Sequence, residues 1–129
     1  MSSFAERLTE YDLGWLIGIL EGEGCFSSQV GRRQYTSISG EKKDYSYKVG
    51  QIIVDSTDEW LIDELVRITG VGKKYYYDKR QQQHYKPIWR WVVSKKKDVA
   101  PLLQVVSGRM SPRRQEALER TQSYVGATI

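Results

Sequence analysis

Apolar and polar residues follow a helical pattern at the start of the chain. Over residues 11–22 the apolar side chains fall at helical spacing, and Thr9 and Asp12 are spaced as the cap and third residue of a helix. Gly24 is well placed to end it. The pattern therefore predicts a first helix over 11–22.

A second helical pattern follows a predicted turn at 55–57. Ser56 and Glu59 have the spacing of a capping box, and the apolar residues after them repeat at helical spacing. The Gly-Val-Gly of residues 70–72 is predicted to end this helix.

Two more helices are predicted near the end of the chain. Residues 98–106 form a short one, in which Pro101 fits only within the first turn because proline lacks the N–H that a helix interior needs. Ser111 followed by Pro112 predicts the start of a last helix that runs to about residue 124.

Alternation of apolar and polar residues predicts four strands between these helices. The ranges are 25–33, 45–54, 73–80 and 85–95. Polar residues join them in two hairpins, through a loop at 37–43 and three glutamines at 81–83. The order predicts one α+β domain over 1–129, an antiparallel sheet with helices on one face and polar, basic and aromatic side chains on the other.

The composition excludes several kinds of site and several classes of protein. The 129 residues include one cysteine, Cys25, and one histidine, His84, so a disulfide framework or a zinc site of several Cys and His ligands is excluded. No segment is apolar for long enough to cross a membrane, and the N-terminus lacks a secretory signal pattern, so we expect an intracellular protein.

The charge, +4 overall, is unevenly distributed. Residues 73–97 hold nine lysines and arginines against one acid, Asp78, whereas residues 1–30 hold five acids against Arg7. Basic residues interleaved with tyrosine and tryptophan are typical of nucleic-acid surfaces, although a solvated strand pair accounts for them equally well.

The first helix contains Gly14, Gly18 and Gly22 on one face, followed by Glu23 at its C-terminal end. Such a face permits close approach of a second helix, and because the motif occurs once, the partner would be the same helix of a second subunit. Two copies of Glu23 at two negative helix ends would then favour a cation such as Mg²⁺. A helix whose glycines pack on the sheet, with solvated acids at its end, is the alternative.

Residues 16–24, LIGILEGEG, with the following Cys25-Phe26 resemble the signature of the LAGLIDADG homing endonucleases. The predicted element order also matches that family's αββαββα order, so the resemblance extends over about residues 9–120. It implies a saddle-shaped sheet and a homodimer through the motif helix. It also implies site-specific hydrolysis of double-stranded DNA at a palindromic or nearly palindromic site, in the compartment that holds the target genome. A non-cleaving DNA-binding regulator or an RNA-binding intron maturase on the same fold is the alternative.

The resemblance also implies roles for residues. Glu23 and the backbone carbonyl of Gly22 would bind Mg²⁺ or another divalent cation such as Mn²⁺, with no small-molecule cofactor, and Glu21 would be structural. Arg113, with Arg114 next, would be the catalytic basic residue at the start of the last helix, where lysine is usual. Val54 and Asp58 stand where family members often have polar residues that order water, and Asp55 would substitute only if the strand bulged by one residue.

Base reading would fall to the open face of the sheet. The predicted DNA-binding residues are Ser27, Gln29, Arg33, Tyr45, Tyr47, Gln51, Lys73, Tyr75, Tyr77, Lys86 and Arg90. A slip of one residue in strand register would move every one of these to the other face, and packing within the sheet explains any single tyrosine as well. We expect Lys42, Lys43 and Lys95–Lys97 to contact phosphates.

Overall fold

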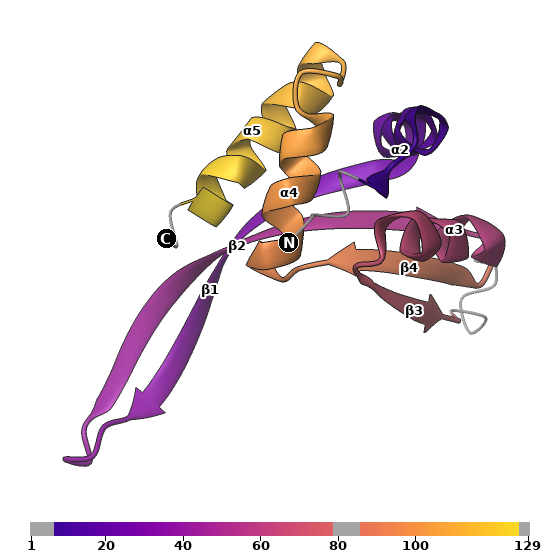
Figure 1. The fold of residues 1–129 in the computed structure, drawn as a ribbon. Coiled ribbons are helices and arrows are strands. Elements are labelled where there is room, and N and C mark those ends of the chain that lie inside the picture. Colours follow the sequence, from indigo (N-terminus) through magenta and orange to yellow (C-terminus); the bar gives the residue numbers. More distant parts are fainter. Residues whose placement is uncertain (1–6, 79–85, 127–129) are drawn as a thin grey trace.

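The computed structural model describes residues 7–78 and 86–126. Within them the chain forms helices and strands in the predicted order (Figure 1). The elements are α2 (Glu10–Glu23), β1 (Gly24–Thr36), β2 (Lys42–Ser56), α3 (Glu59–Thr69), β3 (Lys73–Tyr77), β4 (Ile88–Val93), α4 (Lys96–Val106) and α5 (Pro112–Gly126). The glutamines at 81–83, predicted to form a turn, lie outside the described residues.

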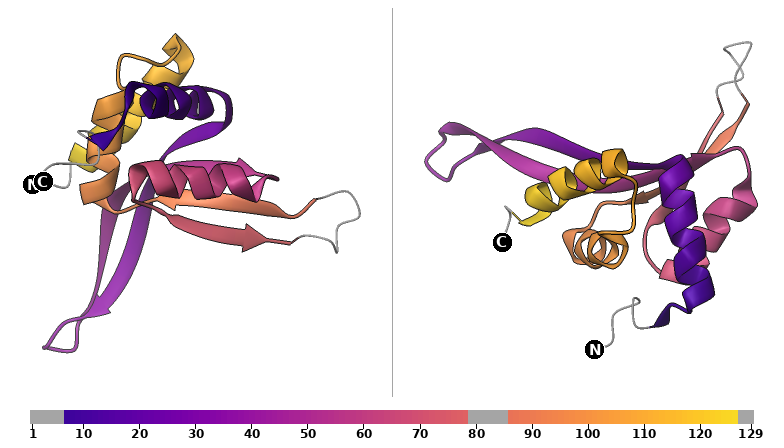
Figure 2. Two further views of the ribbon diagram at one scale, coloured as in Figure 1. Left: turned by 45° about the vertical axis from the view of Figure 1, so that its right-hand side comes forward. Right: turned by 90° about the horizontal axis from the view of Figure 1, so that it is seen from above.

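The four strands form one antiparallel sheet in the order β1-β2-β4-β3. Figure 1 shows β1 and β2 as a long hairpin that projects beyond the helices. In Figure 2 this hairpin and the β3–β4 pair leave the helical layer in different directions, so the sheet is saddle-shaped. The predicted α+β fold class, with helices on one face of an antiparallel sheet, is confirmed.

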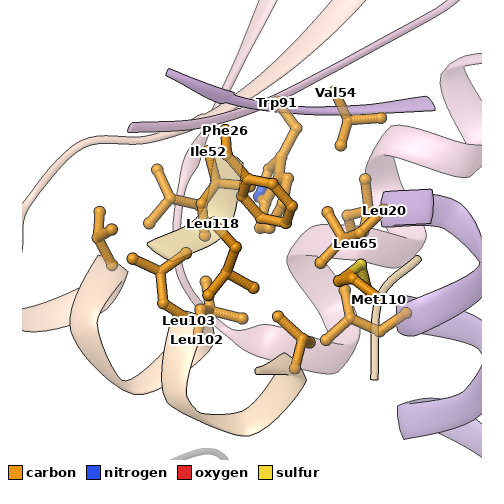
Figure 3. Close-up of a cluster of buried hydrophobic side chains, with 14 of the residues drawn as sticks. Leu20, Phe26, Ile52, Val54, Leu65, Trp91, Leu102, Leu103, Met110 and Leu118 are labelled. Carbon is orange, nitrogen blue, oxygen red and sulfur yellow. The ribbon is translucent and has the colours of Figure 1, made fainter. Parts of the chain in front are cut away.

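The core lies between the sheet and the helices. Ile52 and Val54 of β2 and Trp91 of β4 are fully buried on the helical side. Their neighbours in Figure 3 include Leu20 of α2, Leu65 of α3, Leu102 and Leu103 of α4, and Leu118 of α5. Because successive strand residues point to opposite faces, these buried positions assign every other residue of each strand to the open face.

Helix α5 crosses β1 and β2 at a glycine. A Cβ added to Gly50 would lie 2.6 Å from Val125 Cγ2 and 3.0 Å from Thr121 Cγ2. Across the pair, Ser28, the strand partner of Gly50, places its Oγ 3.1 Å from Thr121 Oγ1. The missing side chain therefore lets α5 approach the sheet closely.

Local predictions differ from the structure at three places. Ser56 does not cap α3: β2 continues through Ser56, and Asp58 is the cap, accepting a hydrogen bond from Trp60 N at 3.0 Å. Helix α4 begins at Lys96, so Pro101 lies beyond its first turn. Lys86 precedes β4, which begins at Ile88, rather than lying within a strand.

Candidate nucleic-acid interface and metal site

Helix α2 ends in an exposed carboxylate. Thr9 caps its start, as predicted, by accepting a hydrogen bond from Asp12 N at 3.0 Å. Glu23 is the last helical residue and is exposed, and Gly24 closes the helix by donating its N–H to Leu20 O. The last carbonyls of a helix have no partner within it and form its negative end, so the carboxylate and the Gly22 carbonyl are hard oxygen donors in a place that favours a cation.

Glu21, two residues earlier, is engaged with helix α5. Its Oε1 accepts a hydrogen bond from Ser111 N at 2.6 Å, and its Oε2 accepts one from Ser111 Oγ at 2.9 Å. The backbone hydrogen bond from Ser111 is the main cause that lowers the pKa of Glu21 below its ordinary value, and nearby Arg114 contributes to it. Glu21 therefore joins the end of α2 to the start of α5.

Two arginines at the start of α5 have different surroundings. Arg113, the predicted catalytic residue, is exposed and lines a shallow hollow with Cys25, Arg114 and Arg120. Arg114 donates to the carbonyl oxygen of Gly24 and places its Nε 3.7 Å from Glu21 Oε2. The arginine that contacts the end of the motif helix is thus Arg114, which sequence reasoning ranked second.

The positions at the end of β2 and just after it supply no further acid to Glu23. Val54 is fully buried and pairs in register with Gly24, so the strand carries no bulge there. Asp58 caps α3, and Asp55 binds Arg90. Within residues 7–78 and 86–126, no three His, Cys, Asp or Glu side chains are grouped so that they could hold a metal ion.

The register places the predicted base-reading residues of all four strands on one face. Ser27 pairs with Gln51, Arg33 with Tyr45, and Tyr75 with Arg90. These positions alternate with the buried Ile52, Val54 and Trp91, so they face away from the helices. Gln29, Tyr47, Lys73 and Tyr77 fall on the same side by the same alternation. Lys86 is exposed but lies outside the strands.

Aromatic rings and cations are in contact along the distal β1–β2 hairpin. The Arg33 guanidinium lies 5.5 Å from the centre of the Tyr47 ring, and hydrogen bonding to Tyr47 is the main cause that raises the pKa of Arg33. Tyr45 and Tyr47 have ring centres 6.2 Å apart, and Tyr35 continues the row at 5.7 Å from Tyr45. These rings and charges, exposed except for the half-buried Tyr47, form a surface suited to a polyanion with flat bases.

Where β2 pairs with β4, the open face contains an ion pair. Arg90 Nε and Nη2 donate to the two carboxylate oxygens of Asp55 at 2.6 and 2.9 Å, and this pairing is the main cause that raises the Arg90 pKa. The guanidinium also lies 5.1 Å from the centre of the Tyr77 ring. Sequence reasoning proposed Arg90 and Tyr77 but missed Asp55 as their neighbour, which only the β2–β4 pairing reveals.

The other predicted lysines are distributed around this face. Lys42 and Lys43 at the start of β2 are exposed, as are Lys95 and Lys97 near the start of α4, while Lys96 is half-buried. Lys74, by contrast, points to the helical side, where its Nζ lies 2.6 Å from Glu59 Oε2 and 2.9 Å from Asp63 Oδ1. Alternation thus places Lys73 on the open face and Lys74 on the helical side, where Glu59 and Asp63 of α3 neutralise the charge of Lys74.

The glycine face of α2 is unobstructed within the described chain. A Cβ built on Gly14, Gly18 or Gly22 would have no heavy atom within 4 Å outside its own helix backbone and chain neighbours. The glycines therefore do not pack on the sheet, which removes one of the two explanations for them.

No protein-family model and no curated protein that was compared matches the sequence. Solved structures do. The homing endonuclease I-CvuI, solved in complex with DNA, has a TM-score of 0.70 at 12% identity, with 92% of this chain and 69% of that chain covered. For the homing endonuclease I-TnaI the TM-score is 0.69 at 14% identity, with 90% and 72% covered.

A longer protein matches over part of its length. The I-LtrWI LAGLIDADG homing endonuclease, solved bound to target DNA, has a TM-score of 0.65 at 16% identity, with 94% of this chain but 38% of that chain covered. The chain has the LAGLIDADG endonuclease fold. It spans about two thirds or more of I-CvuI and I-TnaI and less than half of I-LtrWI. The helices of the described residues include none long and apolar enough to cross a membrane.

Proposed function

We propose that the chain is a site-specific, divalent-metal-dependent DNA endonuclease that acts as a homodimer. The observation that carries the proposal is the exposed Glu23 at the end of a helix whose glycine face is open. It lies at the junction with a polar, basic sheet face, in a fold shared with endonucleases solved on DNA.

The donors at the end of α2 fit a hard divalent cation such as Mg²⁺ or Mn²⁺. A carboxylate and a backbone carbonyl are the oxygen ligands that Mg²⁺ prefers, and the helix end adds negative potential. Because Glu21 is engaged by Ser111, the described part of one chain leaves Glu23 as the available carboxylate at this helix end. The fit therefore improves when a second α2 brings its own Glu23 alongside. When bound, the metal ions supply Lewis-acid stabilisation of the phosphodiester transition state and activate water.

Different residues of the chain then have different roles in cleavage and in DNA recognition. Glu23 and the Gly22 carbonyl hold the cation, and Gly14, Gly18 and Gly22 let two motif helices approach. Arg113 or Arg114 neutralises charge on the phosphate; neither transfers a proton, because guanidinium stays charged. The open face of the sheet reads base edges in the major groove, and the surrounding lysines hold phosphates.

Selection from a random library of DNA duplexes tests the proposal. The wild-type protein is incubated with the library in Mg²⁺, and the cleaved ends are sequenced; a parallel incubation in Ca²⁺, followed by recovery of bound duplexes, provides the binding control. We expect one palindromic or nearly palindromic site in both arms, cut only in Mg²⁺. Enrichment in the binding arm with no cut ends would instead identify a DNA-binding regulator. No enrichment in either arm would contradict recognition of DNA and leave an RNA partner as the alternative.

A further inference from the structure

The open face of the sheet contains an arginine held in place from two sides. Arg90 of β4 is cross-strand from Asp55 of β2 and from Tyr75 of β3. Asp55 accepts two hydrogen bonds from it, at 2.6 and 2.9 Å, and the centre of the Tyr77 ring lies 5.1 Å from its guanidinium carbon. Both charged side chains remain accessible, with 35% of Arg90 and 40% of Asp55 exposed.

The pairing leaves part of the guanidinium for another ligand. Arginine has five N–H donors in a fixed planar fork, and Asp55 engages Nε and one N–H of Nη2. Three N–H groups, one on Nη2 and two on Nη1, are not used by Asp55, and hydrogen bonding to Tyr77, a minor cause of the raised Arg90 pKa, engages at most part of them. Two of these, one from each terminal nitrogen, point in parallel from the end of the fork, which is the geometry that binds two acceptors at once.

Guanine presents two such acceptors, N7 and O6, side by side on its major-groove edge. Adenine replaces O6 with an amino group that donates, so the same fork cannot bind both positions. A carboxylate on a DNA-binding face repels phosphates, although it can also accept a hydrogen bond from a base amino group. Both oxygens of Asp55 are instead engaged by Arg90, so its contribution to base reading acts through that arginine.

We infer that Asp55 and Tyr77 fix the Arg90 fork so that it reads guanine at one position of the target, with Asp55 as the positioning residue. This inference rests on the proposed function, since it names the base that the open face selects. Without Asp55, Arg90 keeps its charge but must lose side-chain freedom when it binds a base. The preference for guanine should therefore fall more than the overall affinity for DNA.

The test compares base preferences of four proteins in Ca²⁺, using duplexes recovered from a random library. Wild type, Asp55→Asn, Arg90→Ala and the double variant are each selected, after circular dichroism shows that each is folded. We expect wild type to prefer guanine over adenine by about tenfold to a hundredfold at one position in each half of the target site, the half that one subunit binds. Arg90→Ala and Asp55→Asn should both reduce that preference to a few-fold at this same position only, and the double variant should lose no more than Arg90→Ala.

Arg33→Ala is the matched control. Arg33 is on the same face, its contacts in the described structure are with tyrosines rather than with a carboxylate, and its loss should leave the Arg90 position unchanged. Asp55→Asn that binds every sequence more tightly, with the guanine preference intact, would show that Asp55 only neutralises charge and would overturn the inference. Retention of the preference in Arg90→Ala overturns it as well. If wild type enriches no sequence at all, both the proposed function and the inference are wrong. If wild type enriches a site whose base preferences are unchanged in Asp55→Asn and Arg90→Ala, the inference alone is refuted.

Discussion

Glu21 and Glu23 show how two acids of one motif take different environments. Residues two apart on a helix point about 200° apart around its axis, so one side chain faces α5 when the other faces solvent. Glu21 uses both oxygens on Ser111, and Glu23 is exposed at the end of α2. The geometry thus leaves Glu23 as the acid of the motif that is open to a cation and a phosphate.

Glu23→Gln should abolish cleavage and leave DNA binding intact or stronger. The amide removes a charged metal ligand and a negative charge beside the phosphates. Cleavage in Mg²⁺ and binding in Ca²⁺, measured on the selected site, separate these effects. Glu10→Gln, the same exchange at the other end of α2, is the control and should cut normally; cutting by Glu23→Gln at the wild-type rate would refute the site.

Glu21 should contribute stability that depends on pH. Its pKa in the folded protein is lowered, chiefly by the backbone hydrogen bond from Ser111, so its contribution is present above its ordinary pKa of 4.5 and is lost as pH falls through the lower folded value. Glu21→Gln should therefore unfold at lower urea concentration than wild type at pH 7, with the difference shrinking in acid. Glu41→Gln, in the exposed hairpin loop, serves as the control, and equal urea midpoints for wild type and Glu21→Gln at pH 7 would contradict this role.

At the scale of elements, signals carried by neighbouring residues predicted the structure well. The α2 cap at Thr9 and the end of α3 before Gly70 depend on a few adjacent residues, and both were found as predicted. The Ser56 cap was wrong because β2 continues to pair with β4, where Ser56 is opposite Trp89. Pairing with a distant strand overrode a local turn signal.

The same distinction applies to the candidate site. The open-face residues could be chosen from alternation alone, because one face is fixed by burial of Ile52 and Val54. The contacts of Arg114 with Gly24 and of Asp55 with Arg90 join residues 90 and 35 positions apart, and no sequence period encodes them. Element packing, rather than motif spacing, determines which arginine meets which acid.

Gly50→Ala should destabilise the packing of α5 on the sheet. The added methyl would lie 2.6 Å from Val125 Cγ2 and 3.1 Å from the backbone oxygen of Thr121, so the Val125 side chain or the helix that carries it must shift. We expect a loss of about 1–3 kcal/mol in the free energy of unfolding, as for other overpacked sites, measured by urea denaturation. Ser123→Ala, at an exposed position of α5, provides the comparison; a Gly50→Ala protein with wild-type stability would show that α5 adjusts freely.

At the scale of the whole molecule, the helices and the polar surface are segregated. Figure 2 shows the helices gathered on one side of the saddle, while the β1–β2 hairpin and the β3–β4 pair extend beyond them. This leaves a long curved face of tyrosines, arginines and lysines without a helix over it in the described chain. A single copy presents one such face and one Glu23, so the proposed cutting of two DNA strands at a palindromic site calls for a second copy related by a two-fold axis.

Gly18→Leu tests that second copy. In residues 7–78 and 86–126, no heavy atom outside its own helix backbone and chain neighbours lies within 4 Å of a Cβ at Gly18. The folded monomer therefore has room for a side chain there, whereas two helices in backbone contact do not. We expect wild type to sediment as a dimer, and Gly18→Leu to sediment as a folded monomer that no longer cuts both strands. Ser123→Leu adds the same side chain to an exposed position of α5 and should remain dimeric. If Gly18→Leu stays a dimer with wild-type cleavage, the two subunits meet elsewhere, and the glycine face has another role.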